Sequence, residues 1–300
     1  MRKIAGLVVA VVVVLGIAGF ALLHGDGASG QPTRMRISAA VKVPTSTKTY
    51  SMTVAGVRRS YEVIEPATGL PPSDPIIVTL SGLGASVAAE VARDQLTPYV
   101  TFDEAELVYP VAIQTSWDAV GCCGYASAHN VNDLAFITDL VAKVDPGKRR
   151  SIYVLGFSNG ARLAYRIACT DPGLFDAYAM VKGVPLPGCT VTKPLTLIEA
   201  ASVDDPEIPY RPGDHGLEPL PVTTLMAQLH TTEKCPAASM VTRDKDMTLT
   251  TWSGCAEGSR LAFAVWATGK HLFPRPPVTE LGAAPVIWSF LTQTPLAPLP

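Results

Sequence analysis

The sequence predicts an α/β fold: a mostly parallel central sheet with helices on both faces, preceded by an N-terminal antiparallel hairpin. Short, continuous apolar runs alternate along the chain with segments whose apolar residues have helical spacing. Apolar strands separated by helices are typical of a parallel sheet that is covered on both faces. The length of 300 residues and the hydrophobic content of 48% fit one large globular domain, or at most two small ones.

The first 23 residues predict a membrane anchor or a signal peptide. Arg2 and Lys3 precede an uncharged, apolar run over residues 4–23. In a helix this run rises about 30 Å, the thickness of the bilayer core. A cleaved signal peptide has a shorter apolar core and ends at an A-x-A-like site, and no such site is clear here. The length therefore favours an uncleaved anchor over a cleaved signal peptide, and both over a buried helix.

An anchor or a signal peptide would place residues 24–300 outside the cytoplasm, and the positive flank supports that orientation. Residues 24–46 are rich in Gly, Ser and Pro and lack a hydrophobic period, which predicts a flexible linker. We therefore expect the folded domain to span residues 47–300.

Within this domain, the alternating pattern on both sides of Ala55-Gly56 predicts the hairpin, and Pro66 ends it. A further helix-like pattern covers residues 222–235. The remaining apolar runs predict strands over residues 75–82, 106–111, 151–157, 177–183, 194–202 and 261–268, and helices over residues 130–144 and 159–171.

All six cysteines follow the export segment, and an even set in an exported chain indicates disulfides rather than metal ligands. No C-x-x-C pair occurs, so the usual zinc spacing is absent. The sequence leaves the pairing open, although Cys235 with Cys255 is the preferred local pair. The cysteines are Cys122, Cys123, Cys169, Cys189, Cys235 and Cys255.

The net charge of −2 gives no basic excess that would indicate binding to nucleic acid or to anionic lipid. We therefore expect a small or neutral molecule as the partner, and contact with a membrane only through the N-terminal segment. The oligomeric state stays open.

Gly156-Phe157-Ser158-Asn159-Gly160 matches the pattern G-x-S-x-G, which forms a sharp turn from a strand into a helix. The five residues alone are a weak signal, and a serine in a plain structural turn is the alternative. Because a predicted strand precedes the motif and a predicted helix follows it, we favour Ser158 as a nucleophile.

A nucleophilic serine needs a base, and only three histidines lie downstream of Ser158. His230 falls within a helix-like segment, where a surface or capping role is expected. His215 lies in a Gly/Pro-rich loop and would line a site. His271 follows the last predicted strand, where the base of this arrangement belongs, so we favour His271 over His215.

The orienting acid is expected after the preceding strand, where Asp204 and Asp205 are adjacent and Glu207 is close by. Adjacent side chains point in different directions, so only one is expected to reach the imidazole. The other would cap the turn before Pro206.

The negative charge that develops on a substrate carbonyl oxygen requires hydrogen-bond donors that are already in place. One expected donor is the backbone N–H of Asn159, directly after the nucleophile. The other is the backbone N–H of Leu83, between Gly82 and Gly84 in the loop after an early strand. A plain glycine turn is the alternative for that loop.

Several segments together resemble the polyhydroxybutyrate depolymerase and feruloyl esterase-like hydrolases, a family with the α/β-hydrolase fold. The resemblance extends over residues 50–277. Its matching pieces are SWDAVGCCG (116–124), VNDLAFITDLV (131–141), LGFSNGARLAYRIAC (155–169), DPEIPY (205–210) and KHLFP (270–274).

The resemblance implies that Ser158 is the nucleophile, that His271 is the base, and that Asp205 rather than Asp204 is the triad acid. It also implies a structural role for Asp133 and cysteine pairs around the triad loops. Three positions depart from the family pattern: Ser81-Gly82 at the oxyanion loop, Ala201-Ser202 ahead of the acid, and Lys270 before the base.

The leading hypothesis is an exported serine esterase that forms an acyl-enzyme on Ser158 and acts on a small or polymeric feruloyl, acetyl or hydroxyalkanoate ester. No cofactor and no metal are expected. A cell-envelope acyltransferase with the same triad is one alternative. A catalytically silent binding protein is another, motivated by the three departures.

Overall fold

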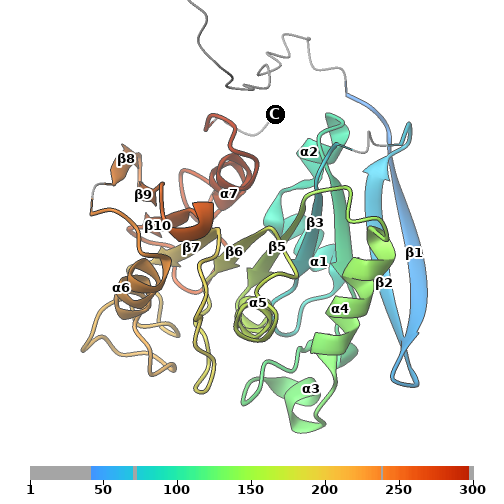
Figure 1. Ribbon diagram of the computed structural model, residues 1–300, viewed down its shortest axis with the longest axis horizontal. Coiled ribbons are helices and arrows are strands. Elements are labelled where there is room, and N and C mark those ends of the chain that lie inside the picture. The colour runs from blue at the N-terminus through green and yellow to red at the C-terminus, as the bar shows by residue number, and fades with distance from the viewer. Residues whose placement is uncertain (1–41, 70–72, 238, 297–300) are drawn as a thin grey trace, which may run out of the picture. The chain divides into compact units, whose positions relative to one another are not determined.

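A computed structural model describes residues 42–69, 73–237 and 239–296. The predicted membrane segment, residues 4–23, and most of the predicted linker lie outside these residues. Ten strands in the described part of the chain form one sheet in the order β1-β2-β4-β3-β5-β6-β7-β10-β9-β8 (Figure 1). The strands are β1 Thr45–Val54, β2 Val57–Pro66, β3 Ile76–Leu80, β4 Glu106–Pro110, β5 Ile152–Phe157, β6 Ala177–Val181, β7 Leu197–Ser202, β8 Met240–Asp244, β9 Met247–Trp252 and β10 Leu261–Trp266.

The six central strands, from β4 to β10 in sheet order, are all parallel to one another. Antiparallel pairs complete the sheet at both ends. The mostly parallel sheet that the sequence predicts is therefore confirmed, and the carboxyl ends of β5, β6, β7 and β10 lie in a row at one edge.

Strands β1 and β2 form a hairpin that pairs Val54 with Val57 across the turn. Ala55 and Gly56 both have positive φ, 46° and 82°, as the tight two-residue turns of twisted hairpins require. Strand β1 begins at Thr45, slightly before the expected start of the domain at Thr47.

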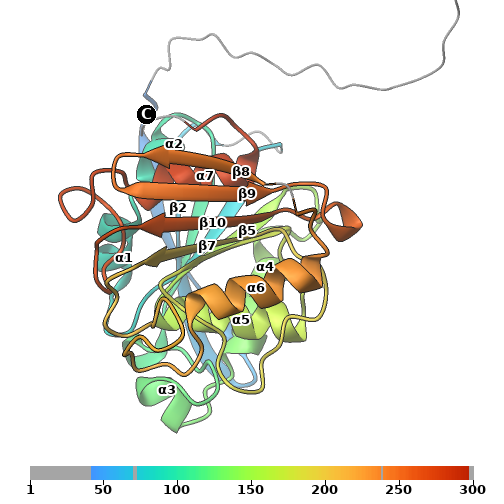
Figure 2. The ribbon, with the colours of Figure 1, turned by 90° about the vertical axis from the view of Figure 1, so that its left-hand side faces the viewer.

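Helices cover both faces of the sheet, as Figure 2 shows for α5 and α6 on one side. Ile76 and Val78 of β3 face the core beneath α4, α5 and α6, whereas Ile77 faces the core beneath α2 and α7. This alternation follows from the two-residue period of a strand. The helices are α1 Val87–Asp94, α2 Thr97–Thr101, α3 Gly124–Ala128, α4 Asp133–Val144, α5 Asn159–Thr170, α6 Val222–Glu233 and α7 Ala283–Thr292, with short 3₁₀ turns η1 Ile113–Thr115 and η2 Ala256–Gly258. No helix of the described segments is long and apolar enough to cross a membrane.

The sequence patterns missed the β8–β9 hairpin and the helices α1, α2, α3 and α7. Strand β8 is a mostly exposed edge strand, so its residues lack the apolar face that marks a buried strand. Helix α7 is apolar along nearly its whole length and is mostly buried, so it lacks an amphipathic spacing.

All six cysteines form disulfides in the described residues. Cys235 bonds with Cys255, which confirms the preferred local pair. The other two pairs join Cys169 to Cys189 and the adjacent residues Cys122 and Cys123.

Candidate active site

Ser158 lies in the sharp turn between β5 and α5. Its backbone has φ 52° and ψ −115°, a conformation that L-residues rarely adopt. The two glycines of the motif make this tight turn sterically possible, because neither carries a Cβ. A Cβ on Gly156 would lie 2.6 Å from the Cα of Ala161, and a Cβ on Gly160 would lie 2.1 Å from the carbonyl oxygen of Leu80. The glycines let α5 approach β3 and β5 closely enough to hold Ser158 at the edge of the sheet.

His271 lies between Ser158 and Asp205. Its Nε2 is 2.9 Å from the Oγ of Ser158, and its Nδ1 is 3.0 Å and 3.1 Å from the two carboxylate oxygens of Asp205. A carboxylate only accepts hydrogen bonds, so Nδ1–H donates to Asp205 and Nε2 is left to accept the proton of the serine hydroxyl. The three residues follow β5, β7 and β10, whose carboxyl ends lie at the same edge of the sheet.

Asp205 is held as an anion in this position. Burial alone would raise the pKa of its carboxyl, but the hydrogen bond and charge of His271 and the N–H groups of Ile208 and Glu207 lower the pKa below its ordinary value. Those two N–H groups donate to Oδ1 over 3.0 Å and 2.9 Å. Asp205 therefore caps its own turn while it faces the imidazole.

Asp204 does not cap the turn before Pro206, contrary to the expectation for the second aspartate. Its Oδ1 accepts the backbone N–H of Lys270 over 2.8 Å. The adjacent aspartates thus both contact the loop that carries His271, one through the backbone and one through the imidazole.

Lys182 is a buried cation beside the triad that the sequence patterns did not single out. It directly follows β6, its Nζ donates to the carbonyl oxygen of Lys270 over 2.7 Å, and this ammonium is 3.8 Å from Oδ2 of Asp205. Burial lowers the pKa of Lys182 to about 8, although the charges of Asp205 and Asp204 oppose this shift. The sequence does show a lysine directly after an apolar strand. It does not show that this lysine contacts Asp205 and the backbone of Lys270 after folding.

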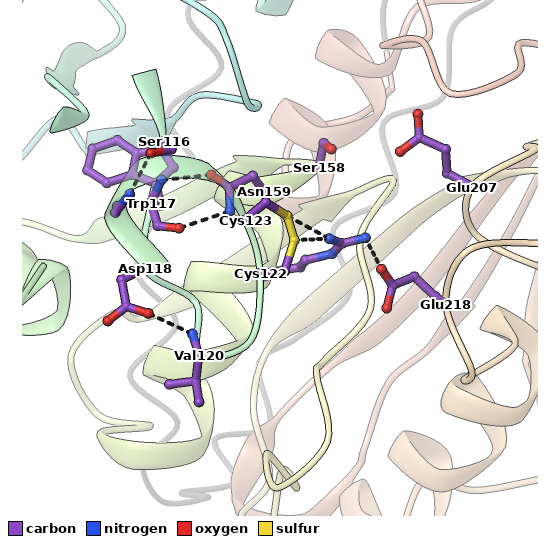
Figure 3. The surroundings of a disulfide bond; sticks show 12 residues. Ser116, Trp117, Asp118, Val120, Cys122, Cys123, Ser158, Asn159, Glu207 and Glu218 are labelled. Atoms are coloured by element: carbon purple, nitrogen blue, oxygen red, sulfur yellow. Dashed lines mark hydrogen bonds and ion pairs between the residues drawn. A yellow bond between two sulfur atoms is a disulfide. The ribbon is translucent and has the colours of Figure 1, made fainter. Parts of the chain in front are cut away.

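The side chain of Asn159 is fully engaged away from the reaction centre. Its Oδ1 accepts the backbone N–H of Trp117 over 2.7 Å and its Nδ2 donates to the Trp117 carbonyl over 3.1 Å (Figure 3). Because α5 begins at Asn159, the backbone N–H groups of its first turn have no acceptor within the helix. The backbone of Asn159, rather than its amide side chain, is thus available at the nucleophile.

Leu83 lies in the exposed turn after β3, and the residue is 52% exposed. The neighbouring N–H of Gly84 donates to the carbonyl oxygen of Thr115 over 2.8 Å. The Leu83 N–H has no acceptor within the described part of the chain. The roles of the Leu83 and Asn159 N–H groups as oxyanion donors stay predictions.

Asp133, at the start of α4, joins segments of the chain that lie apart in the sequence. Its carboxylate accepts Nη2 of Arg59 and the backbone N–H of Asp118, both over 2.7 Å, and it is fully buried. Burial raises the pKa of Asp133 despite these contacts. The residue therefore ties β2 and the loop of Asp118 to the start of α4, some distance along the chain from the nucleophile.

Arg162 lies in α5, one turn after Ser158, and it joins two loops beside the site. Its guanidinium donates to the sulfur atoms of Cys122 and Cys123 and pairs with Glu218 (Figure 3). The disulfide loop and the loop that follows Asp205 are thus both fixed to the helix of the nucleophile.

The other two candidate histidines lie outside the triad. His230 is in the last turn of α6, where its ring lies edge-on against Trp252. His215 lines a cavity of about 400 Å³ together with Asp204 and Asp205.

Comparisons with known proteins indicate the fold. No protein-family model matches the chain. A curated protein of Nocardia uniformis subsp. tsuyamanensis, named "Putative esterase NocK", is 29% identical over 188 residues, which are 60% of this chain. The match spans about half of that relative's length, 53%.

Two solved structures share the architecture. The acetyl xylan esterase from Aspergillus awamori matches with a TM-score of 0.53 at 15% identity and covers 76% of this chain and 96% of its own. A thermostable esterase matches with a TM-score of 0.50 at 14% identity and covers 74% of this chain and 55% of its own. With the parallel sheet and its helical layers, these likenesses show that the chain has the α/β-hydrolase fold.

Proposed function

We propose that the protein is a serine esterase that hydrolyses carboxylic esters through an acyl-enzyme on Ser158. The observation that carries the proposal is the position of His271, which is within hydrogen-bond distance of both the Ser158 hydroxyl and the Asp205 carboxylate. A general base placed in this way turns a weakly nucleophilic hydroxyl into one that attacks an ester.

In acylation, Nε2 of His271 takes the hydroxyl proton while Oγ of Ser158 forms a bond to the ester carbonyl carbon. The negative charge moves to the carbonyl oxygen, where the N–H groups of Asn159 and Leu83 would stabilise it. The imidazolium then returns its proton to the alkoxide as the C–O bond breaks, and the alcohol leaves. Asp205 stays ionised and stabilises the imidazolium.

In deacylation, water replaces the alcohol. His271 takes one water proton, the hydroxide oxygen attacks the acyl carbon, and the bond to Oγ of Ser158 breaks as Nε2 returns the proton to the serine. The products are a carboxylic acid and the free enzyme, so no cofactor enters the cycle.

The segments that resemble the polyhydroxybutyrate depolymerase and feruloyl esterase-like hydrolases support a place in that group, with feruloyl, acetyl and hydroxyalkanoate esters as substrate types to test. The three disulfides support a location outside the cytoplasm, where thiols are oxidised. A catalytically silent protein gains no support from His271, because its Nε2 faces the serine.

The test is the hydrolysis of p-nitrophenyl acetate together with labelling by a fluorophosphonate, which reacts with activated serines. We expect Ser158→Ala to abolish labelling and to lower kcat/KM at least about a thousandfold, because no other group supplies the nucleophile. The melting temperature of the variant should stay close to that of the wild type. A wild-type protein that neither hydrolyses the ester nor takes the label would overturn the proposal.

A further inference from the structure

Glu207 places a second carboxylate at the reaction centre. Its Oε2 is 3.4 Å from Nε2 of His271, the same nitrogen that lies 2.9 Å from the Ser158 hydroxyl. The side chain is 41% exposed, so it borders both the imidazole and the solvent. This carboxylate takes no part in the acylation and deacylation steps.

The backbone holds Glu207 in this position. Its N–H donates to Oδ1 of Asp205 over 2.9 Å, and its carbonyl accepts the N–H groups of Leu217 and Glu218 over 2.7 Å and 3.2 Å. A Cβ on Gly216 would lie 2.9 Å from that same carbonyl oxygen, so the two segments are in close contact. The loop that orients the triad acid therefore also fixes the place of Glu207.

The charge of Glu207 is not neutralised within the described residues. Its only ionic partner there is His271, which is a cation only when protonated. Arg162 is already paired with Glu218. Lys270 adjoins His271, but its side chain is exposed, so water screens its charge.

The alcohol part of an ester must lie beside this carboxylate. When the acyl-enzyme forms, Nε2 of His271 returns the proton to the leaving oxygen, which must come within about 3 Å of Nε2. Substituents on the next carbon atoms of the alcohol are then a few ångströms from Oε2 of Glu207.

We propose that Glu207 is a specificity-determining residue that favours esters whose alcohol carries a positive charge close to the ester oxygen. This inference rests on the proposed esterase function. A fixed carboxylate attracts a nearby cation and repels an anion, and the partial burial of Glu207 strengthens this effect relative to bulk water. Cationic alcohols should therefore be preferred to neutral ones of the same shape.

The test compares acetylcholine with 3,3-dimethylbutyl acetate, which has the same shape but carries a neutral carbon in place of the quaternary nitrogen. The measured quantity is the ratio of the two kcat/KM values. We expect Glu207→Gln to lower this ratio about fivefold, since one charge–charge attraction at a half-exposed site is lost. Because both substrates are measured on one preparation, a partly unfolded fraction cancels.

Glu257→Gln is the matched control, because it removes an equal charge at the amino end of β10, whereas His271 follows the carboxyl end of that strand. Its ratio should equal that of the wild type. A change of less than about twofold in Glu207→Gln, well below the loss expected for a charge beside the leaving alcohol, would overturn the inference. Activity on p-nitrophenyl acetate separates this result from a failure of the esterase proposal, which would remove hydrolysis of all three esters.

Discussion

Lys182 shows at the scale of one residue how the scaffold supports the candidate triad. Its ammonium is buried between the Lys270 carbonyl and the Asp205 carboxylate, so it connects the base loop to the acid loop. A charged group in such a position loses its hydration, and this loss outweighs the attraction of the nearby aspartates in setting its pKa.

This pKa predicts a dependence of stability on pH. The unfolded chain keeps the lysine proton up to about pH 10.5, whereas the folded protein releases it near pH 8. Between these values the unfolded state binds more protons, so a rise in pH favours the folded state. We expect the free energy of unfolding of the wild type, relative to Lys182→Met, to rise by about 2 kcal/mol between about pH 7 and pH 9.5.

Urea unfolding of both proteins at the two pH values measures this difference. Groups whose titration does not depend on Lys182 contribute equally in the two proteins, so they cancel in the comparison. A difference that stays constant with pH, or falls, would show that Lys182 does not release its proton early on folding.

The residues brought together at the site differ in how far the sequence predicted them. Ser158, Asp205 and His271 follow three strands, and their order along the chain led to the expectation that they meet at one sheet edge. The structure brings them within hydrogen-bond distance, while their catalytic roles stay a prediction. Lys182 and the contact of Glu207 with His271 depend on side-chain packing across that edge, which no local pattern encodes.

At the scale of elements, the contact of α5 with β3 decides the geometry of the nucleophile turn. Gly160 is in the first turn of α5, where its Cα lies against the carbonyl of Leu80. A methyl group there would have to displace the backbone of a buried strand, which has no room to move because its neighbours pair with it on both sides.

We therefore expect Gly160→Ala to lower the free energy of unfolding by about 3 kcal/mol and to abolish labelling of Ser158. Gly173→Ala is the control, since a Cβ on Gly173 would meet nothing within 4 Å. Urea unfolding should show that this control changes the free energy of unfolding by less than about 0.5 kcal/mol. Equal stability of the two variants would contradict the close approach of α5 to β3.

Helices and strands could be predicted from the sequence where their burial against the core produces a recognisable spacing or run of apolar residues. The central strands and the amphipathic helices α4, α5 and α6 were predicted because one or both faces pack against the core. Strand β8 and helix α7 were not, because an exposed edge strand and a nearly all-apolar helix both lack the periodicity on which such predictions depend.

In the whole molecule, the folded domain carries the candidate triad, and the N-terminal segment is predicted to attach the chain to a membrane. The described residues begin the sheet at Thr45 and contain all three disulfides, so the core, the sheet and the candidate triad lie C-terminal to residue 41. Residues 4–23 supply the uncharged, apolar run whose length predicts a membrane anchor.

We expect a chain that begins at Lys42 to fold, to hydrolyse p-nitrophenyl acetate and to remain in the supernatant after ultracentrifugation of lysed cells. The full-length chain should sediment with the membranes, because an apolar run of about 20 residues spans the bilayer core. Mass spectrometry of the full-length product supplies the control. A soluble product that lacks the N-terminal segment would favour a cleaved signal peptide, whereas an intact soluble chain would contradict both the anchor and the signal peptide. Sedimentation of the shortened chain would show instead that the folded domain itself binds the membrane.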